Sequence, residues 1–351
     1  MTDLSFYRGK RILVTGHTGF KGSWLCKLLL LAGADITGYS LAPPTDPSLF
    51  VLAGLEKELH SVTGDVRDFE HLYRVFQEAG PEIVFHLAAQ PIVRESYRVP
   101  RYTYETNVMG TVNLMECVRL CPGVKSVVNV TTDKVYQNPE RGEAFREEEP
   151  LDGFDPYSNS KSCSELVTAS YVRSFFAGGG TAVSAARAGN VIGGGDFAKD
   201  RILPDCVRAV AAGQPVIVRN PHSVRPYQHV LEPLGAYLEI ARAQYEDPRF
   251  AGAYNVGPDE SDCVTTGRLA DLFCRYWGPG AVWEDRAEPG APHEAAFLRL
   301  DCRKLKETFG WQPRWNVEKA VEMTCAFSKV WLAGGDVPGE MAREIGMFLE
   351  G

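Results

Sequence analysis

The first half of the chain alternates short apolar, β-branched runs with longer segments of helical length, and this alternation constrains the fold most. The runs cover residues 11–15, 36–39, 59–63, 83–87, 126–131 and 182–187. The helical segments between them cover residues 24–32, 69–79, 104–120 and 158–176. Strands separated by helices of this length pair in parallel through right-handed crossovers. The sequence therefore predicts an α/β protein with a doubly wound parallel sheet.

The pattern becomes less regular after Arg187. Glycines at 189 and 193–195 precede a helical stretch at 202–212 and a short strand-like run at 216–218. This change predicts two units, residues 1–187 with the sheet and residues 188–351 as a smaller, mixed α/β lobe. We expect the strand-like segments 227–230 and 253–256 to return to the first sheet, which makes the second lobe discontinuous.

Composition excludes several classes of partner. The 351 residues carry a formal net charge of −8, which argues against nucleic acid. The most apolar helical segment, residues 24–34, contains Lys27 and falls short of the roughly 20 residues that a membrane span requires. The amino terminus lacks the long apolar stretch of a secretory signal. Nine cysteines without a CxxC pair favour reduced thiols in a cytoplasm, and no metal site is expected.

A glycine-rich turn follows the first predicted strand. Gly16, Gly19 and Gly22 are spaced three residues apart, and a helical pattern begins near Ser23. Glycines here allow a tight turn, close approach to a pyrophosphate and close packing of the helix, whose N-terminus faces the phosphates. Three glycines alone are equally compatible with an ordinary strand-to-helix turn. Their position directly after a strand favours a dinucleotide site.

The adenosine half of such a ligand would lie beyond the next strands. The acidic residue expected about 20 residues after the glycines is absent, and Ser40 is the substitute ribose contact. No Arg stands near that strand end to bind a 2′-phosphate, which favours NAD over NADP. Asp65, next to Val66, is expected to accept from adenine, with a loop or helix-cap role as the alternative. Leu87, Ala88 and Ala89 follow the fourth strand, where the small alanines let a cofactor approach.

Two groups of residues suit catalysis. Tyr157 and Lys161 stand four residues apart, on one face of a helix. The lysine charge and a positive nicotinamide ring would stabilise a phenolate that takes a proton from a sugar hydroxyl. Thr132, Asp133 and Lys134 end the fifth strand with a hydroxyl, a carboxyl and an amine, which suits elimination across neighbouring carbons. The structural alternatives are a half-buried tyrosine with a surface lysine, and a turn in which Asp133 caps and Lys134 is solvated.

Six segments together resemble the sugar-nucleotide members of the extended short-chain dehydrogenase/reductase superfamily, the NAD-dependent epimerase/dehydratase family. They are residues 15–24 (TGHTGFKGSW), 87–90 (LAAQ), 132–136 (TDKVY), 157–161 (YSNSK), 187–193 (RAGNVIG) and 225–230 (RPYQHV). The resemblance implies a Rossmann-type NAD-binding domain and a carboxyl-terminal sugar-nucleotide lobe. The Asp-Lys pair at 133–134 is most like the dehydratases of CDP-glucose, because dTDP-glucose dehydratases carry Asp-Glu there and 4-epimerases usually lack the pair.

The resemblance implies a lyase that converts CDP-glucose to CDP-4-dehydro-6-deoxyglucose and water. Bound NAD would oxidise C4, water would leave across C5 and C6, and the hydride would return to C6. Tyr157 would be the base at the C4 hydroxyl, with Lys161 and Thr132 assisting. Asp133 would protonate the departing C6 hydroxyl, and Lys134 would remove the C5 proton. A Lys134 that stays protonated would instead stabilise an enolate.

The resemblance also supplies binding residues and partners. The cofactor-binding set is Gly16, Thr18, Gly19, Phe20, Lys21, Gly22, Ser40, Asp65, Val66, Leu87, Ala88, Ala89, Tyr157 and Lys161. The substrate-binding set is Gln90, Asn190, Arg225, whose guanidinium would fork the pyrophosphate, and His293, for which a structural role is the favoured alternative. A homodimer through the helices at 104–120 and 158–176 is expected.

Two other hypotheses remain open. An epimerase, or a dehydratase of another nucleotide sugar, would use the same scaffold, and residues 133 and 134 discriminate between them. A non-catalytic dinucleotide sensor would keep the glycines but would not need Tyr157 with Lys161.

Overall fold

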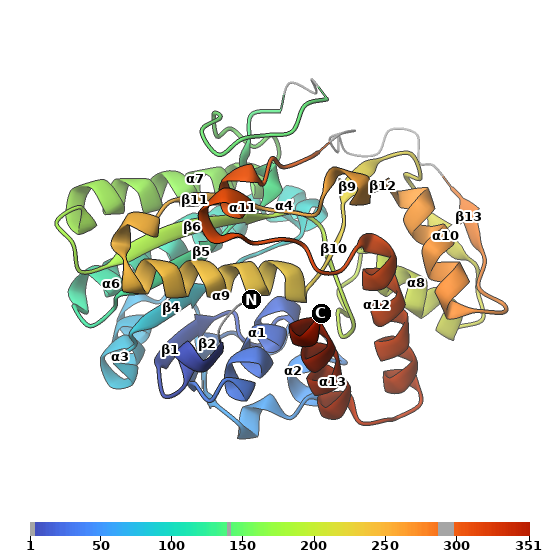
Figure 1. Cartoon of the computed structure of the whole chain (residues 1–351), viewed down its shortest axis with the longest axis horizontal. Helices are drawn as coiled ribbons and strands as arrows, with labels where there is room; N and C mark the ends of the chain where they lie inside the picture. Colours follow the sequence, from blue (N-terminus) through green and yellow to red (C-terminus); the bar gives the residue numbers. More distant parts are fainter. Residues whose placement is uncertain (1–3, 139–141, 287–297) are drawn as a thin grey trace.

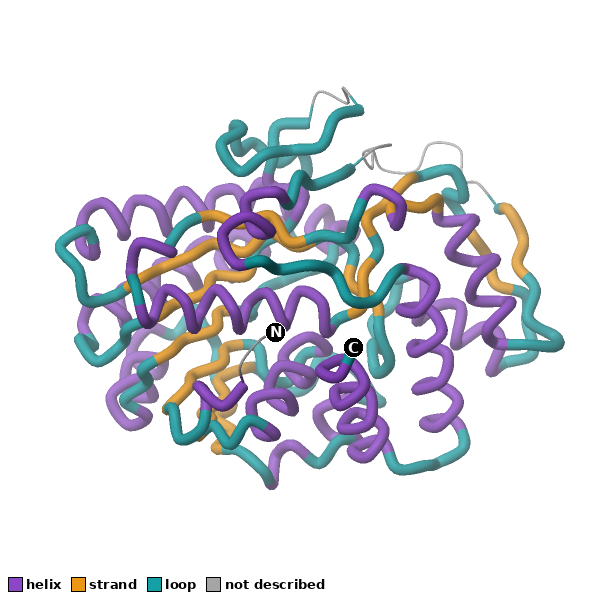
Figure 2. The backbone as a smooth tube through the Cα atoms, in the orientation of Figure 1, coloured by secondary structure: helices purple, strands orange, loops and turns teal. Residues whose placement is uncertain are grey.

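The computed structural model of the chain describes residues 4–138, 142–286 and 298–351. A seven-stranded parallel sheet with strand order β11-β6-β5-β4-β1-β2-β3 forms its centre (Figures 1 and 2). Its strands are β1 (Arg11–Thr15), β2 (Asp35–Ser40), β3 (His60–Thr63), β4 (Ile83–His86), β5 (Ser126–Val130), β6 (Ala182–Ala188) and β11 (Ala253–Val256). The predicted sheet is confirmed, and each predicted strand end lies within one residue of the observed bound.

Helices cover both faces of the sheet, because successive side chains of a strand point to opposite faces. Ile12 and Val14 of β1 belong to an apolar core shared with α1 (Phe20–Leu31), α9 (Leu231–Glu246) and α13 (Val337–Glu350). Leu13 faces the other way, into a core shared with α3 (Phe69–Ala79) and α6 (Gly110–Leu120). The strand order reverses between β1 and β4, so the ligand crevice of such a sheet is expected at their carboxyl ends.

A second group of elements extends from one end of the sheet, at the right of Figure 1. It has an apolar core of its own, formed by residues of α8, β8, α10 and α12. Its elements are β7 (Val191–Ile192), α8 (Ile202–Ala211), β8 (Val216–Val218), β9 (Val224–Pro226), β10 (Gln228–His229), β12 (Cys263–Thr265), α10 (Thr266–Trp277), β13 (Trp283–Asp285) and α12 (Val317–Leu332). The remaining helices are α2 (Leu49–Leu52), α4 (Val93–Arg98), α5 (Pro100–Tyr104), α7 (Pro156–Tyr171) and α11 (Arg303–Phe309).

Two expectations about strands and helices need correction. Residues 253–256 do join the sheet beside β6, but residues 227–230 do not, because Gln228 pairs with Val191 in a separate two-stranded sheet. The place beside β6 is taken by β11. The predicted helices at 104–120 and 158–176 each contain a π-helical turn, η3 (Glu105–Met109) and η5 (Val172–Phe176). The division at residue 187 stays a prediction.

Two further features concern the whole chain. Among the described residues, no helix is both long and apolar enough to span a bilayer. All nine cysteines lie in described segments, and each is a free thiol.

Candidate active site

The glycine turn joins β1 to α1 in a conformation that other residues would not adopt. Gly16 has a φ of +77°, and a Cβ added there would lie 2.7 Å from the amide nitrogen of Ala88. A Cβ on Gly22 would lie 2.1 Å from the carbonyl oxygen of Gly16. Both positions therefore require the absence of a side chain, one for the turn and one for the approach of the helix to it.

Helix α1 begins at Phe20, not near Ser23. Gly19 is the N-cap residue and has no side chain to cap the helix. Ser23 instead donates its hydroxyl hydrogen to the carbonyl oxygen of Gly19, at 2.9 Å. The first amides of α1 thus have no side-chain cap among the described residues. A helix N-terminus in this state suits the phosphates of a dinucleotide, so the turn fits the predicted group.

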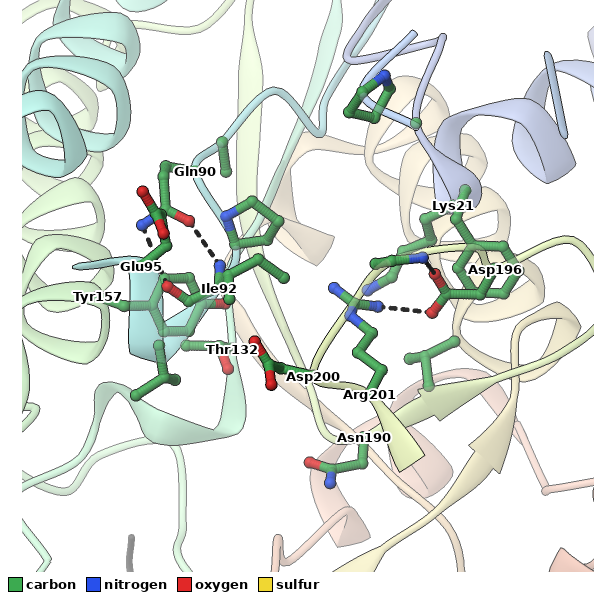
Figure 3. A pocket seen from close by; sticks show the side chains of 18 of the residues that line it. Lys21, Gln90, Ile92, Glu95, Thr132, Tyr157, Asn190, Asp196, Asp200 and Arg201 are labelled. Carbon is green, nitrogen blue, oxygen red and sulfur yellow. Dashed lines mark hydrogen bonds and ion pairs between the residues drawn. The ribbon is translucent and has the colours of Figure 1, made fainter. Parts of the chain in front are cut away.

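A cleft of about 1260 Å³ runs along the carboxyl edge of the sheet and into the second group of elements (Figure 3). The whole predicted cofactor-binding set lines it, together with Thr132, Asp133, Lys134, Gln90, Asn190 and Arg225. His293 lies outside the described residues. The strand-end motifs, which are far apart in the sequence, therefore meet in one cavity.

The residues predicted for the adenosine half already have partners in the chain. The Thr18 hydroxyl donates to the carbonyl oxygen of Leu41 at 3.0 Å and also shares a hydrogen bond of 2.9 Å with Ser40. Arg67 binds both carboxylate oxygens of Asp65 and lowers the pKa of that carboxyl, although partial burial acts to raise it. The helix-cap alternative for Asp65 is wrong, because Asp68 caps α3.

Tyr157 and Lys161 lie on the first turns of α7, at the wall of the cleft. Burial raises the pKa of Tyr157 to about 12, against the effect of the Thr132 hydroxyl. The Lys161 ammonium donates to the carbonyl oxygen of Val130 at 3.0 Å. Burial lowers the pKa of Lys161 to about 8, and the charge of Glu165 opposes this shift. At neutral pH, Lys161 is therefore mostly protonated and Tyr157 is a phenol, which needs further positive charge nearby to act as a base.

Thr132, Asp133 and Lys134 form a hydrogen-bonded group on the same wall. Asp133 Oδ1 accepts from Thr132 Oγ1 at 2.9 Å and from Lys134 Nζ at 3.0 Å. Asp133 is fully buried, and its Oδ2 atom has no hydrogen-bond partner within the described segments. Asp133 is not the cap that the structural alternative predicts, because Thr132 caps the short helix η4 (Asp133–Val135), and the partly exposed Lys134 binds Asp133. One carboxylate oxygen thus remains for a ligand.

The predicted substrate residues differ in what their side chains bind. Asn190 Oδ1 accepts from Lys134 Nζ at 3.4 Å. Arg225 is 5% exposed and donates to the carbonyl oxygen of Val224 at 3.0 Å. The Gln90 amide donates to Thr103 Oγ1 at 2.9 Å and to the carbonyl oxygen of Ile92, and it accepts from the Ile92 amide at 2.7 Å. Gln90 therefore fixes the loop after β4, as the dashed lines in Figure 3 show.

Several charged residues in and behind the cleft carry no role that the sequence predicts. Asp196 accepts from Arg201 at 3.1 Å, and Arg201 lies near Lys21, opposite Tyr157 and Thr132 in Figure 3. Burial, with the charges of Arg201 and Lys161, lowers the pKa of Lys21 to about 7. Behind Lys161, Glu165 forms a buried ion pair with Arg187. Arg187 is the first residue of the RAGNVIG segment (residues 187–193), whereas its partner Glu165 lies on α7.

Comparison with known proteins agrees with this geometry. A model of the NAD dependent epimerase/dehydratase family matches residues 12–257. The chain is 47% identical to a CDP-glucose 4,6-dehydratase of Salmonella typhimurium, over 99% of both chains. It is 31% identical to a dTDP-glucose 4,6-dehydratase of Streptomyces antibioticus, over 89% of this chain and 90% of that one. Its fold is similar to that of a Thermus thermophilus UDP-glucose 4-epimerase in complex with NAD, with a TM-score of 0.77, 27% identity and coverage of 91% and 98%.

Proposed function

The chain belongs to the NAD dependent epimerase/dehydratase family, and from this premise we propose that it is a lyase that removes water from CDP-glucose. The product is CDP-4-dehydro-6-deoxyglucose. The observation that carries the proposal is the Asp133–Lys134 pair, with Nζ and Oδ1 at 3.0 Å, in the cleft that also holds Tyr157 and Lys161. An epimerase needs only the Tyr157–Lys161 pair, whereas elimination needs a second acid and base. The 47% identity to a CDP-glucose 4,6-dehydratase supports the same assignment.

The residues that hold the cofactor are those of the glycine turn and of the small-residue segment after β4. The tight turn at Gly16 and the uncapped N-terminus of α1 suit the pyrophosphate of NAD. When bound, NAD supplies the acceptor and donor of the electron pair for the oxidation of C4 and the reduction of C6. Ala88 and Ala89 leave room beside it.

The proton transfers at C4 fall to α7. Tyr157 takes the proton of the C4 hydroxyl, and Thr132, whose own hydroxyl acts on the pKa of Tyr157, orients the C4 hydroxyl. The Lys161 ammonium lies on the same face of the helix, one turn further along. Its charge favours the phenolate that Tyr157 must become, because an opposite charge nearby stabilises the ionised form.

Residues that follow the end of β5 carry out the elimination. When the proton of the 3.0 Å contact between Asp133 and Lys134 is on Asp133, Lys134 is a neutral amine that accepts the C5 proton, and Asp133 donates its own proton to the departing C6 hydroxyl, which leaves as water. The buried Oδ2 atom of Asp133, without a partner among the described residues, is the atom from which that proton comes. Asn190 holds Lys134 and the sugar-phosphate region, while Arg225 and Gln90 complete the substrate contacts among the described residues, and His293 stays a predicted substrate residue.

The test offers the purified protein CDP-glucose, dTDP-glucose, GDP-mannose and UDP-glucose and follows the near-ultraviolet absorbance of the 4-keto product in alkali. We expect product from CDP-glucose. Asp133→Asn should lower kcat roughly 10²- to 10⁴-fold and accumulate reduced nicotinamide, because C4 is oxidised but C6 keeps its hydroxyl. Lys134→Ala should suppress elimination while NAD stays bound.

Lys125→Ala is the matched control, because this exposed lysine stands at the opposite end of β5 and should leave activity unchanged. No 4-keto product from any of the four nucleotides contradicts the lyase. Inversion at C4 without 4-keto product would favour the epimerase instead. Full activity of Lys134→Ala would remove Lys134 from the mechanism.

We also propose that two copies associate through α6 and α7 with their π-helical turns. Four large apolar side chains on these segments are well exposed: Met109 (49%), Leu120 (38%), Leu166 (55%) and Phe175 (55%). Burial of this surface against a second copy would remove it from water. The free thiols support a cytoplasmic location.

A further inference from the structure

A buried ion pair lies directly behind the catalytic wall. The side chains of Glu165, on α7, and Arg187, on β6, are each 4% exposed. Arg187 Nε donates to both carboxylate oxygens of Glu165 at 2.9 Å, and Nη2 donates to Oε2 at 2.5 Å. Taking two charges out of water costs free energy that such a pair does not reliably recover. Stability alone therefore does not explain why an ion pair is buried at this position.

The pair connects the two groups of proposed catalytic residues. Glu165 follows Lys161 by one turn of α7, so the two side chains lie on the same face of the helix. Glu165 Oε1 also accepts from Thr131 Oγ1 at 2.6 Å, and Thr131 directly precedes Thr132 and Asp133.

Arg187 extends these contacts to the other end of the Thr-Asp-Lys group. Its Nη1 atom donates to the Tyr136 hydroxyl at 2.8 Å and to the carbonyl oxygen of Glu147 at 2.9 Å. Tyr136 comes two residues after Lys134. Glu165 and Arg187 thus hold the residues on both sides of the group that carries the elimination.

The charge of Glu165 also acts on Lys161. Burial disfavours the ammonium, and Glu165 is the charge that opposes this effect. From the other elements, Lys21 on α1 and His86 on β4 are the ionisable groups that interact with Lys161, and neither offers negative charge. Burial lowers the pKa of His86 to about 3, so this side chain is neutral at physiological pH. Tyr157 and Asp133 face the same part of the cleft.

We propose that Glu165, oriented by Arg187, is a positioning residue that fixes Lys161 against the end of β5 and supplies the negative charge that keeps Lys161 protonated. This inference rests on the proposed function, in which the Lys161 ammonium supports Tyr157 as base. Thr131 and Tyr136 transmit the same constraint to Thr132, Asp133 and Lys134.

The experiment compares Glu165→Gln with the double variant Glu165→Gln/Arg187→Met. Glutamine keeps an oxygen for the Thr131 hydroxyl but removes the charge. The double variant avoids an unpaired buried guanidinium, so it folds even if the single variant does not. Glu344→Gln is the control, because it removes a fully buried carboxylate that pairs with His229 on the far side of the sheet core.

Two profiles are measured from about pH 6 to about pH 10, the range in which a buried lysine titrates. One is kcat with CDP-glucose, and the other is the affinity for NADH, followed by its fluorescence. Burial lowers the pKa of both Lys21 and Lys161, but Glu165 acts only on that of Lys161, so an alkaline limb that moves in the Glu165 variants reports Lys161. We expect Glu165→Gln, which leaves Arg187 charged, to move this limb down by about one pH unit, and the double variant, which removes both charges of the pair, to move it down by less. Glu344→Gln should not move it.

An alkaline limb at the same pH in the wild type and both Glu165 variants overturns the inference, even if kcat falls, because a purely structural role changes the rate without moving the limb. A wild type that makes no 4-keto product contradicts the proposed function instead. In that case the NADH profile still decides the role of Glu165.

Discussion

At the scale of single residues, two glycines of the same turn differ in whether a side chain would fit at their positions. Gly16 has a positive φ and would place a Cβ 2.7 Å from the Ala88 amide, whereas a Cβ on Gly19 would meet nothing closer than 3.4 Å. We expect Gly16→Ala to lower the free energy of unfolding by about 1–3 kcal/mol, the usual cost of backbone strain. Gly19→Ala, its matched control, loses only the preference for glycine over alanine at an N-cap and should lower it by less than about 1 kcal/mol. Urea unfolding without NAD measures both, and equal losses would contradict the strain argument.

The residue types of the site were predictable from sequence, but their hydrogen-bond partners were not. Parallel strands bring their carboxyl ends to one edge, so Thr132, Asp65 and Ala88 had to lie near the glycine turn. The partners depend on packing between distant segments. The chain gives no local sign that Thr103 binds the Gln90 amide or that Glu165 binds Arg187, because each pair joins different elements.

At the scale of elements, the strands were predicted more accurately than the start of α1. Apolar β-branched runs mark buried parallel strands directly. A serine near the start of a helix suggests an N-cap, but Ser23 donates back to Gly19 and leaves the cap to a glycine. The short strand β10 was predicted to join the central sheet because its apolar residues resemble those of a sheet strand. It pairs with β7 instead, and β11 is the strand that lies beside β6.

The contact between α9 and the segment before α12 predicts a pH-dependent stability. Glu232 Oε1 accepts from the amides of Arg314 and Trp315 at 2.9 and 2.7 Å, while burial raises the pKa of Glu232 to about 7. Between the ordinary carboxyl pKa and 7, the native state holds a proton that the unfolded state releases, so this group makes stability fall as pH rises. Relative to the wild type, Glu232→Gln should gain about 1–3 kcal/mol of unfolding free energy from about pH 5 to about pH 8.

Urea unfolding at the two pH values measures this gain, and the difference between them cancels any constant cost of the buried amide. Glu246→Gln, at the exposed end of the same helix, serves as the control. A stability difference between Glu232→Gln and wild type that is the same at both pH values would show that Glu232 does not titrate in this window.

At the scale of the whole molecule, the proposed association through α6 and α7 is open to a direct test. Leu166→Glu/Phe175→Glu places two charges on the exposed apolar surface of α7 and η5, and it should convert a dimer into a monomer in analytical ultracentrifugation. Leu332→Glu, on an equally accessible apolar position of α12, should leave the dimer intact. A wild-type protein that is monomeric in solution would contradict the proposed association through α6 and α7.

The packing of α1 against α13 has a consequence for biosynthesis. Helix α1 is translated long before α13, against which it packs, and the outer strand β11 comes only after residue 252. Until α13 has been translated, the apolar side chains of α1 that pack against it stay exposed to water. The sheet also lacks its edge strand β11 for much of that time. The nascent polypeptide therefore completes the packing of α1 only after α13 has left the ribosome tunnel, and its exposed apolar surface is prone to aggregation until then.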